Sequence, residues 1–436
     1  MRKSLWFSLL ALSTQVQASD LVSVYHDALQ GSPILQTDLS TNQATHENIP
    51  IAISALLPQV TVSANLSYTG VNETGFNTNY PSDGYSLMVT QPLFNYTAFS
   101  AMFNVTNSTH AADETYLAQQ QNFILTVAQD YFAVLQAEDN VAFAEAQLKS
   151  LDATLVQTEQ KFEVGVGTYT DVAQARANDQ SAKATLVQNQ NTLADDNETL
   201  RELTGKLETN LAVVKADFPY VLPVPDDLNT WVKNALITNP SLLSEQYTTK
   251  AALATVNQNI GNQLPTVSLV LSLSQTFYRE NVSPVIASPP YESDASIALA
   301  LNWTLFSGGE LMASSLQAAN QYVSSEDTTV NLTRQTQSNV TNDFLSVVSG
   351  RSQVIANKQA VVSAKITLDD YNAKYKVGTA TIVDVLNATQ TLYQDQSNLA
   401  AAEYQYINSS LQLKYDAGTL NAKDLTDLNQ YLQVTE

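Results

Sequence analysis

One seven-residue pattern of apolar side chains occurs twice in this 436-residue chain, and it limits the possible folds more than any other feature. Each position of the first copy has a counterpart at a constant distance in the second, as Val127 has in Val340. A strict seven-residue repeat favours helices that supercoil around one another. We therefore predict long paired helices in both halves, with apolar positions at Val127, Val134, Val141, Leu148, Leu155 and Phe162, and at Val340, Val347, Val354, Val361, Leu368 and Tyr375.

Each heptad segment leads through a glycine-containing turn into a helical segment that runs back. Residues 97–161 contain neither Pro nor Gly, and about 65 helical residues at about 1.5 Å each would extend roughly 100 Å. Each half is therefore expected to contain a long helical hairpin. The returning segments carry apolar heptad positions at Leu186, Leu193 and Leu200, and at Val385, Leu392, Leu399, Tyr406 and Leu413.

Two segments in each half alternate apolar and polar residues, as strands do. Each is about ten residues long, the length of a tilted strand that crosses a bilayer. The polar segments 72–84 and 279–294 contain Gly or Pro and predict hairpin loops. Alternation alone fits a half-buried sheet in a soluble protein equally well. The alternating segments are 60–68, 85–94, 267–273 and 297–305.

The same order of short helices, strand pair and long hairpin in both halves predicts an internal duplication. A connector with three prolines separates the two halves. The predicted boundaries are a signal peptide at 1–18, a first repeat at 19–216, a Pro-rich linker at 217–227, a second repeat at 228–425 and a C-terminal tail at 426–436.

The N-terminal segment, 1–18, has the pattern of a secretory signal peptide. Arg2 and Lys3 are followed by a short apolar run at 5–12 and by the small-residue cleavage site Val16-Gln17-Ala18. The run is shorter than the roughly 20 residues of a spanning helix, so an uncleaved anchor is the less favoured alternative. No other window approaches a transmembrane helix, so a membrane-embedded part would have to be a closed barrel.

Composition excludes several classes of function. There are 20 Lys and Arg against 42 Asp and Glu, a net charge of −22, which excludes a general nucleic-acid binder. The absence of Cys excludes disulfides and thiolate metal sites. Three His and no motif for a nucleophile, a phosphate loop or a zinc protease argue against an enzyme, and we expect no cofactor and no metal.

The strand count predicts an oligomer. Four strands cannot close a barrel, and an open sheet edge cannot lie in hydrocarbon because its backbone groups would lack partners. A dimer would give eight strands and a filled interior, whereas a trimer would give twelve strands and room for a passage. We favour a trimer. The expected fold is mainly α with a membrane β-barrel, in which four long helices from each chain form an α-barrel.

Three segments of the second half, 358–364, 375–386 and 418–425, resemble the TolC family of outer-membrane channel-tunnel proteins, as does Phe306-Ser-Gly-Gly309. The resemblance covers essentially the whole mature chain. It implies a homotrimer with a twelve-stranded barrel in the outer membrane of a Gram-negative bacterium, and a helical tunnel that extends into the periplasm.

The same resemblance implies the exit duct of tripartite efflux pumps or type I secretion systems, a passive channel gated at its periplasmic end. The implied partners are a periplasmic adaptor (membrane fusion) protein, an inner-membrane RND, ABC or MFS transporter, and outer-membrane lipid. An alternative from another class is a trimeric coiled-coil stalk or adhesin with a barrel anchor. That alternative predicts one anchor at one end of the chain, whereas strand pairs occur in both halves.

The resemblance also implies a gate. Asp384 matches the first of two aspartates that ring the mouth of the tunnel, and Asn387 stands in place of the second, so the ring would carry half the charge and bind cations less tightly. The alternative is that Asp384, like its repeat counterpart Asp171, is a helix N-terminal acid that complements the helix dipole. The gate that the resemblance implies also includes Thr170.

Closing links and docking points complete the implied site. Tyr375 and Asp171 match one linked pair of the family, but Ala380 replaces the Arg of a further link, which predicts a less tightly held gate. The hairpin tips match the adaptor docking points, although both glycines there also suit helix C-caps. The tips are Val164 and Gly165, and Val377, Gly378 and Thr379. Separately, Pro50 predicts a kink or break in the second short helix.

Overall fold

The computed structural model describes residues 19–73, 76–208, 210–278 and 291–433. The predicted signal peptide therefore lies outside the described residues, as do residues 279–290 of the second predicted loop and residues 434–436 of the tail. The chain forms two compact units. Unit 1 comprises Met1–Gln36, Gln119–Asn239 and Thr336–Glu436, and unit 2 comprises Thr37–Ala118 and Pro240–Gln335. Each unit thus takes segments from both halves of the sequence.

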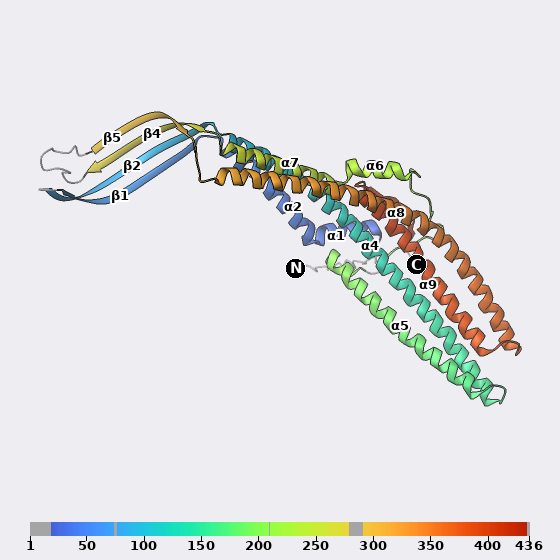
Figure 1. Ribbon diagram of the computed structural model, residues 1–436. Coiled ribbons are helices and arrows are strands. Elements are labelled where there is room, and N and C mark those ends of the chain that lie inside the picture. The colour runs from blue at the N-terminus through green and yellow to red at the C-terminus, as the bar shows by residue number, and fades with distance from the viewer. Residues whose placement is uncertain (1–18, 74–75, 209, 279–290, 434–436) are drawn as a thin grey trace, which may run out of the picture. The chain divides into compact units, whose positions relative to one another are not determined.

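Unit 2 contains an antiparallel sheet of four strands among the described residues (Figure 1). Its strands are β1 (Gln59–Glu73), β2 (Phe76–Phe94), β4 (Thr266–Tyr278) and β5 (Tyr291–Asn302), in the order β1-β2-β4-β5. The sequence predicted a strand pair in each half, and the two pairs meet where β2 lies beside β4. β1 and β5 are the edges of this sheet.

The prediction of a loop at residues 72–84 is wrong, because the described residues of this segment belong to β1 and β2. β1 and β2 pair almost to their ends, with Gly70 opposite Asn79 and Tyr68 opposite Pro81. In the part of the chain that the structure describes, β4 joins β2 only from Ser82 onward, so the residues of β2 before Ser82 form a two-stranded ribbon with β1. Gly and Pro are tolerated there because a ribbon has no further strand that needs their backbone groups. The second strand pair also ends earlier than predicted, because 303–305 lie beyond β5.

The predicted break near Pro50 in the short helices is present, but it lies a few residues earlier in the chain. α2 (Pro33–His46), whose first residues belong to unit 1, is separated from α3 (Asn48–Ser54) at Glu47. The break therefore lies ahead of Pro50. Pro50 itself lies in the first turn of α3, where a helix does not use the backbone N–H that proline lacks. α7 (Pro240–Gly261) is the remaining short helix of unit 2.

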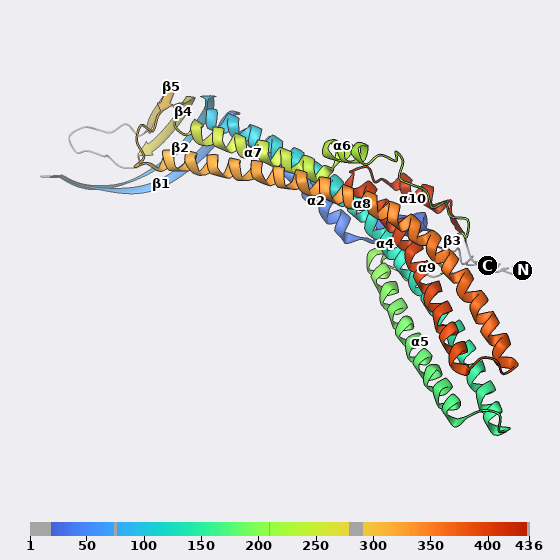
Figure 2. The same cartoon turned by 45° about the vertical axis from the view of Figure 1, so that its right-hand side comes forward.

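Two long helical hairpins are present, as the heptads predicted. α4 (Tyr96–Glu163) has 68 residues and α8 (Glu310–Lys376) has 67, and both helices run through the two units. In unit 1, α5 (Tyr169–Thr204) returns along α4 and α9 (Ile382–Asp416) returns along α8 (Figures 1 and 2). Among the described residues, no helix combines the length and the apolar character that crossing a membrane requires.

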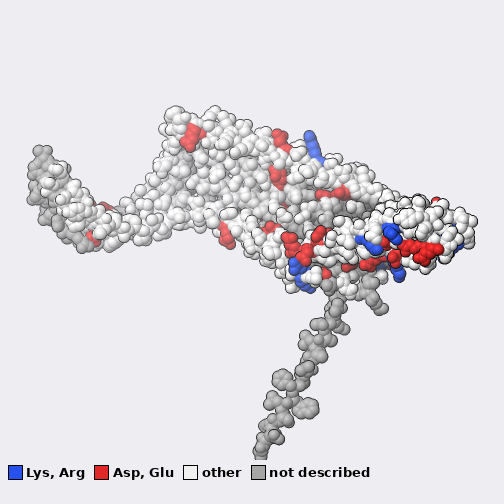
Figure 3. All heavy atoms as spheres, turned by 90° about the horizontal axis from the view of Figure 1, so that it is seen from below, with Lys and Arg blue, Asp and Glu red and all other residues white. Residues whose placement is uncertain are grey.

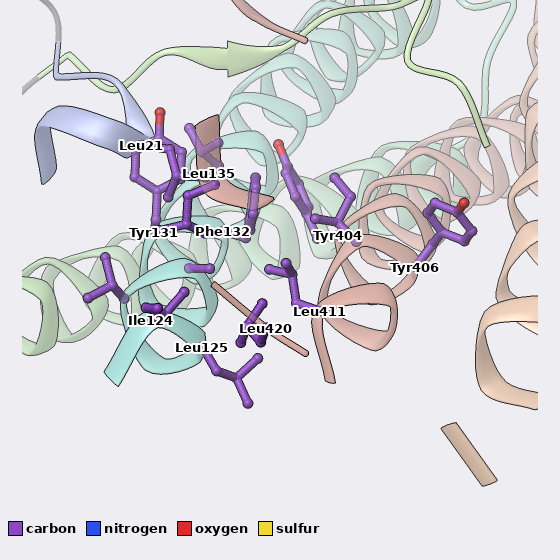
Figure 4. Close-up of a cluster of buried hydrophobic side chains, with 14 of the residues drawn as sticks. Leu21, Ile124, Leu125, Tyr131, Phe132, Leu135, Tyr404, Tyr406, Leu411 and Leu420 are labelled. Carbon is purple, nitrogen blue, oxygen red and sulfur yellow. The ribbon is translucent and has the colours of Figure 1, made fainter. Parts of the chain in front are cut away.

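The smaller elements of unit 1 pack against these hairpins. They are α1 (Leu21–Gly31), α6 (Leu228–Thr238), α10 (Ala422–Asn429), and the two short strands β3 (Val213–Val214) and β6 (Leu432–Gln433), which pair with each other. Together they cover an apolar core that includes Leu21, Tyr131, Phe132 and Leu411 (Figure 4). The core thus lies where the two hairpins meet the shorter helices.

The heptad positions are buried more completely in the second hairpin. Val340, Val347 and Val354 are buried, and so is Tyr375 at the end of the series. In the first hairpin Val127 and Val134 are buried, but the later heptad positions are progressively exposed, and Phe162 is 43% exposed. The buried positions near that end include Ala144, Leu151 and Thr158, which keep the seven-residue spacing on a different stripe of the helix. A helix of 3.6 residues per turn drifts relative to a seven-residue repeat, which explains such a change of face.

Candidate functional site

The two hairpin tips share one backbone design. Gly165 after α4 has φ +79° and Gly378 after α8 has φ +81°. At the first tip the N–H of Val166 donates to the carbonyl of Lys161 at 2.9 Å, and at the second that of Thr379 donates to Lys374 at 2.9 Å. This left-handed glycine cap satisfies the last helical carbonyls and reverses the chain. The C-cap interpretation of both glycines is therefore confirmed.

Each returning helix begins with a capping box. Thr168 caps α5 with Asp171 as the reciprocal acid, and Thr381 caps α9 with Asp384. The Asp384 carboxylate accepts hydrogen bonds from the Thr381 hydroxyl at 2.6 Å and from its N–H at 2.8 Å. These bonds favour the charged form and lower the pKa of Asp384. The interpretation of both acids as helix N-terminal groups is thus confirmed at the level of one chain.

Asp384 differs from Asp171 in what surrounds it. It lines a groove of about 510 Å³ between α8 and α9, together with Asn387 and a second acid, Asp395. The two predicted ring residues are thus brought to one surface. Asp395 was not predicted from the sequence, although Asp384, Asn387, Thr391 and Asp395 follow the three- and four-residue steps of one helix face. The other lining residues are Ala360, Ser363, Ala364, Thr367, Tyr371, Ala388 and Thr391.

The predicted link between Tyr375 and Asp171 is not made within the chain. Both residues are described, but the Asp171 carboxylate accepts from Thr168, at 2.8 Å from its hydroxyl. The Tyr375 side chain is 8% exposed, and its hydroxyl lies 3.4 Å from that of Thr158. Asp171 is engaged in the capping box of α5. The Tyr375 ring packs in the apolar cluster that includes Leu151 and Leu368.

Tyr375 instead contacts Lys161, a residue that was not predicted from the sequence. The Lys161 ammonium lies 3.4 Å from the centre of the Tyr375 ring and donates to the Tyr375 carbonyl at 3.1 Å. We call this pair the tip clasp. It joins the end of α4 to the end of α8. No spacing predicted it, because the repeat counterpart of Lys161, Lys374, pairs with Asp370 of its own helix at 2.6 Å.

The tips present apolar side chains to solvent. Val164 is 73% exposed and Val377 is 75% exposed, and Val166 and Tyr169 are also exposed. Thr170 is exposed in the first turn of α5, and Ala380 is half-buried. Adjacent exposed apolar residues in two neighbouring turns are typical of a surface that contacts another protein. The adaptor-docking residues of the prediction thus lie at accessible positions.

The site has features for recognition and closure. In the described part of the chain, no group of three or more His, Asp or Glu side chains is arranged to hold a metal ion. The described groups at the tips and in the groove are caps, carboxylates, an amide and the tip clasp. Such groups can hold two helices together or release them, and they can attract cations into the groove.

Comparison with known proteins identifies what the chain is similar to. The profile of the family described as "Outer membrane efflux protein" matches residues 24–206 and 231–419. The outer membrane protein TolC of Escherichia coli (strain K12) is 33% identical over 431 residues, which cover 98% of this chain and 87% of TolC. The alkaline protease secretion protein AprF of Pseudomonas aeruginosa is 29% identical, with 96% of this chain and 88% of AprF covered.

A solved structure of CusC, in a study of transmembrane channel formation, has the same fold. It superposes with a TM-score of 0.81 over 92% of each chain, at 19% sequence identity. The arrangement of long hairpins and strand pairs is therefore shared well beyond the range in which the sequences are closely similar.

Proposed function

This chain belongs to the outer membrane efflux protein family, and from that premise we propose how it forms and closes an exit duct. It lies in the outer membrane with its large helical part in the periplasm, and it provides a passive path for efflux and secretion machinery. It is not an enzyme. The resemblance to the TolC family predicted from the sequence is confirmed, and the alternative of a surface stalk or adhesin is not supported.

The observation that carries this function is the near-complete match to a TolC protein. Reconstitution of the purified mature protein in planar lipid bilayers tests it. We expect stepwise ion currents. A bilayer that stays electrically silent at protein concentrations giving stable insertion contradicts the duct.

We propose that three copies close a twelve-stranded barrel, with β1 of one chain pairing with β5 of the next. Supporting this, the apolar side chains of the two edge strands are exposed in the single chain, such as Leu66 at 81% and Ile297 at 72%. Backbone groups on these edges need partners in hydrocarbon. Native mass spectrometry in mild detergent tests the stoichiometry, and a monomer or a dimer would contradict it.

Charge supports the same assignment of the strands to lipid. β4 contains no charged residue. On the face shown in Figure 3, acidic and basic side chains gather over helices, and the surface of the strands is nearly free of them. Val60, Val62 and Leu66 alternate with Thr61 and Ser63, which gives β1 one apolar face for lipid and one polar face for a water-filled passage.

We propose that the hairpin tips form the periplasmic gate, built from Asp384, Asn387, Tyr375, Asp171 and Thr170. In a trimer, three copies of the groove that contains Asp384 and Asn387 would surround one axis. Because Asn387 is neutral, Asp384 supplies the charge at the level where the family carries two acids. The tip clasp holds α8 closed against α4, which compensates in part for the Arg that Ala380 replaces.

We further propose that the tips dock a periplasmic adaptor, which connects the duct to an inner-membrane transporter of the RND, ABC or MFS class. The exposure of all the predicted docking residues supports this: Val164, Gly165, Val377, Gly378 and Thr379. The chain has no Cys, so one introduced at residue 164 or 377 is unique. Crosslinking should capture an adaptor from both positions, and a matched Cys at the exposed Ser40 of α2 should capture none.

A further inference from the structure

Ser19, the first described residue, is held on three sides within unit 1. Its hydroxyl donates to Glu208 Oε2 at 2.6 Å. Its carbonyl accepts from the Ala212 N–H at 3.2 Å and lies 3.5 Å from the Tyr131 hydroxyl, which itself donates to the Ala212 carbonyl at 2.6 Å. Figure 4 shows Tyr131 beside Leu21, which follows closely along the chain. The chain is therefore anchored from residue 19 onward.

The Glu208 carboxylate, which accepts the hydrogen bond from Ser19, is buried, and its charge is only partly neutralised. The Glu208 side chain is 3% exposed, and among the described residues its Oε1 atom has no hydrogen-bond partner. The nearest cation, Lys206, lies 3.4 Å from Oε1 but only 2.6 Å from Asp27 Oδ2. Two carboxylates thus share one ammonium. A buried carboxylate in this position gains from a second cation, because its desolvation is otherwise only partly offset.

The sequence supplies that cation if the signal peptide is cut after Ala18. Cleavage at the Val16-Gln17-Ala18 site makes Ser19 the first residue and converts its backbone nitrogen from a neutral amide to an ammonium with three donors. That nitrogen is three bonds from the Ser19 hydroxyl oxygen, so at most about 4 Å separates the two atoms. The hydroxyl donates to Glu208 Oε2 at 2.6 Å, so the nitrogen lies within about 7 Å of that oxygen. Rotation of the freed chain end can bring the ammonium to the carboxylate, where it forms a charge-assisted hydrogen bond.

We propose that signal-peptide removal occurs between Ala18 and Ser19, and that the new α-ammonium of Ser19 pairs with Glu208. Hydrolysis of the peptide bond leaves a carboxylate on Ala18 and the ammonium on Ser19, with water as the co-reactant. The pair anchors the start of α1, where Asp20 caps the helix and the Leu21 side chain is fully buried. Processing thus completes the packing of α1 in unit 1.

The first test locates the new end and measures its environment. The intact mass of protein purified from outer membranes should correspond to a chain that begins at Ser19, and any other start overturns the proposal. The α-amine of the native protein should react more slowly with an acylating reagent at neutral pH than that of a variant with one Gly inserted after Ala18. Equal rates overturn the proposal, and this comparison needs no change in Glu208.

The second test is a double-variant cycle on the full chain. Hydrogen exchange of the peptide that covers residues 19–31 reports the opening of α1. Glu208→Gln and the Gly insertion should each speed exchange severalfold, and together they should speed it no more than either alone, because both break one ion pair. Glu198→Gln is the matched control, because its acid pairs with Arg201 and not with Lys206 or Ser19, and its effect should multiply with that of the insertion. Fold-changes for Glu208→Gln and the insertion that multiply, or no change in either, overturn the proposal.

The proposal does not depend on the channel function. A protein that begins elsewhere could still conduct ions, and a silent protein could still begin at Ser19, so the bilayer measurement and the mass measurement fail separately.

Discussion

Breaking the tip clasp should open the gate, and the structure gives the size of the effect. Lys161→Met keeps the apolar stem of the side chain but removes the ammonium from the Tyr375 ring and carbonyl. A cation over an aromatic ring contributes about 0.5–2 kcal/mol, and a hydrogen bond from a charged donor about 1.5–3 kcal/mol in a buried setting. Lys161 is half-buried, so hydration of its ammonium offsets part of both contributions.

A net value of about 2 kcal/mol for each chain is therefore expected from the ring contact and the hydrogen bond together. If α8 must separate from α4 before the passage widens, the whole of this energy stabilises the closed tips relative to the open ones. Since 1.4 kcal/mol is a factor of ten, the ratio of open to closed tips should rise roughly thirtyfold for each chain that carries Lys161→Met. The measurement is the open probability of single channels in planar bilayers.

Lys374→Met is the matched control. Lys374 is the repeat counterpart of Lys161, and the substitution removes the same charge from the same level of the hairpins. Its partner, Asp370, belongs to its own helix, so its loss should leave the open probability unchanged. Tyr375→Phe keeps the ring and should also have little effect. An open probability for Lys161→Met equal to that of Lys374→Met would refute the clasp.

Three further predictions concern the gate and its surroundings. Ala380→Arg restores the cation that the family carries and should lower single-channel conductance, and an unchanged conductance counts against a loosely held gate. Asp384→Asn should weaken the block of current by divalent cations added on the periplasmic side, whereas Asp171→Asn, which loses the same kind of cap, should not; equal effects would show that capping alone matters. Burial, followed by the charges of two acids on α5, raises the pKa of Asp130 to about 6. A raised carboxyl pKa means that the folded protein holds the proton more tightly than the unfolded chain, so the associated stability is lost as the pH rises from about 4 through 6. Asp130→Asn should therefore raise the unfolding temperature at about pH 7.5 but not at about pH 4, and a rise of equal size at both pH values would contradict this.

The helical hairpins could be predicted because heptad spacing is a local signal. A helix with apolar residues every seven positions must bury that stripe, whatever lies around it. The deep burial of Val340, Val347 and Val354 follows directly. The spacing could not show where burial changes to another stripe, as it does at Leu151 and Thr158, because that depends on which helix lies opposite.

The length of the strands was underestimated for a different reason. The segment 72–84 is polar and contains Pro81 and Gly84, residue types that form turns in most settings, so it was interpreted as a loop. In the structure its described residues pair with β1, and at Pro81 the missing N–H leaves no neighbour unpaired. Partners on the opposite strand decide this, and a single sequence does not display which residues they are.

The hairpin tips show most clearly what repeats can and cannot predict. Both copies contain the same glycine cap and the same Thr-to-Asp capping box, because these depend only on residues within one turn. The two repeat-related lysines, Lys161 and Lys374, are locally equivalent as well. Only Lys161 reaches another helix, since the two hairpins pack against different neighbours. The clasp and the groove at Asp384 are therefore products of packing.

The seam between α4 and α9 explains why the tip should control movement of the second hairpin. Toward the middle of the hairpins, Tyr404 donates to Asp139 at 2.8 Å and Ser397 donates to Asn140 at 2.7 Å. Asn140 and Ser397 also line a crevice of about 320 Å³ whose walls are largely Asn, Gln, Ser and Thr side chains. Such groups exchange a protein partner for water at little net cost.

The tip is different, because Tyr375 lies in an apolar cluster with Leu368, Ile382 and Leu386. Withdrawing α8 from α4 there exposes the ring to water and also breaks the contact with Lys161. Between the crevice and the tips, the contact between the hairpins that costs the most free energy to break is therefore the one at the tips. A substitution at Lys161 acts on that contact, whereas one in the crevice leaves polar groups that water can satisfy.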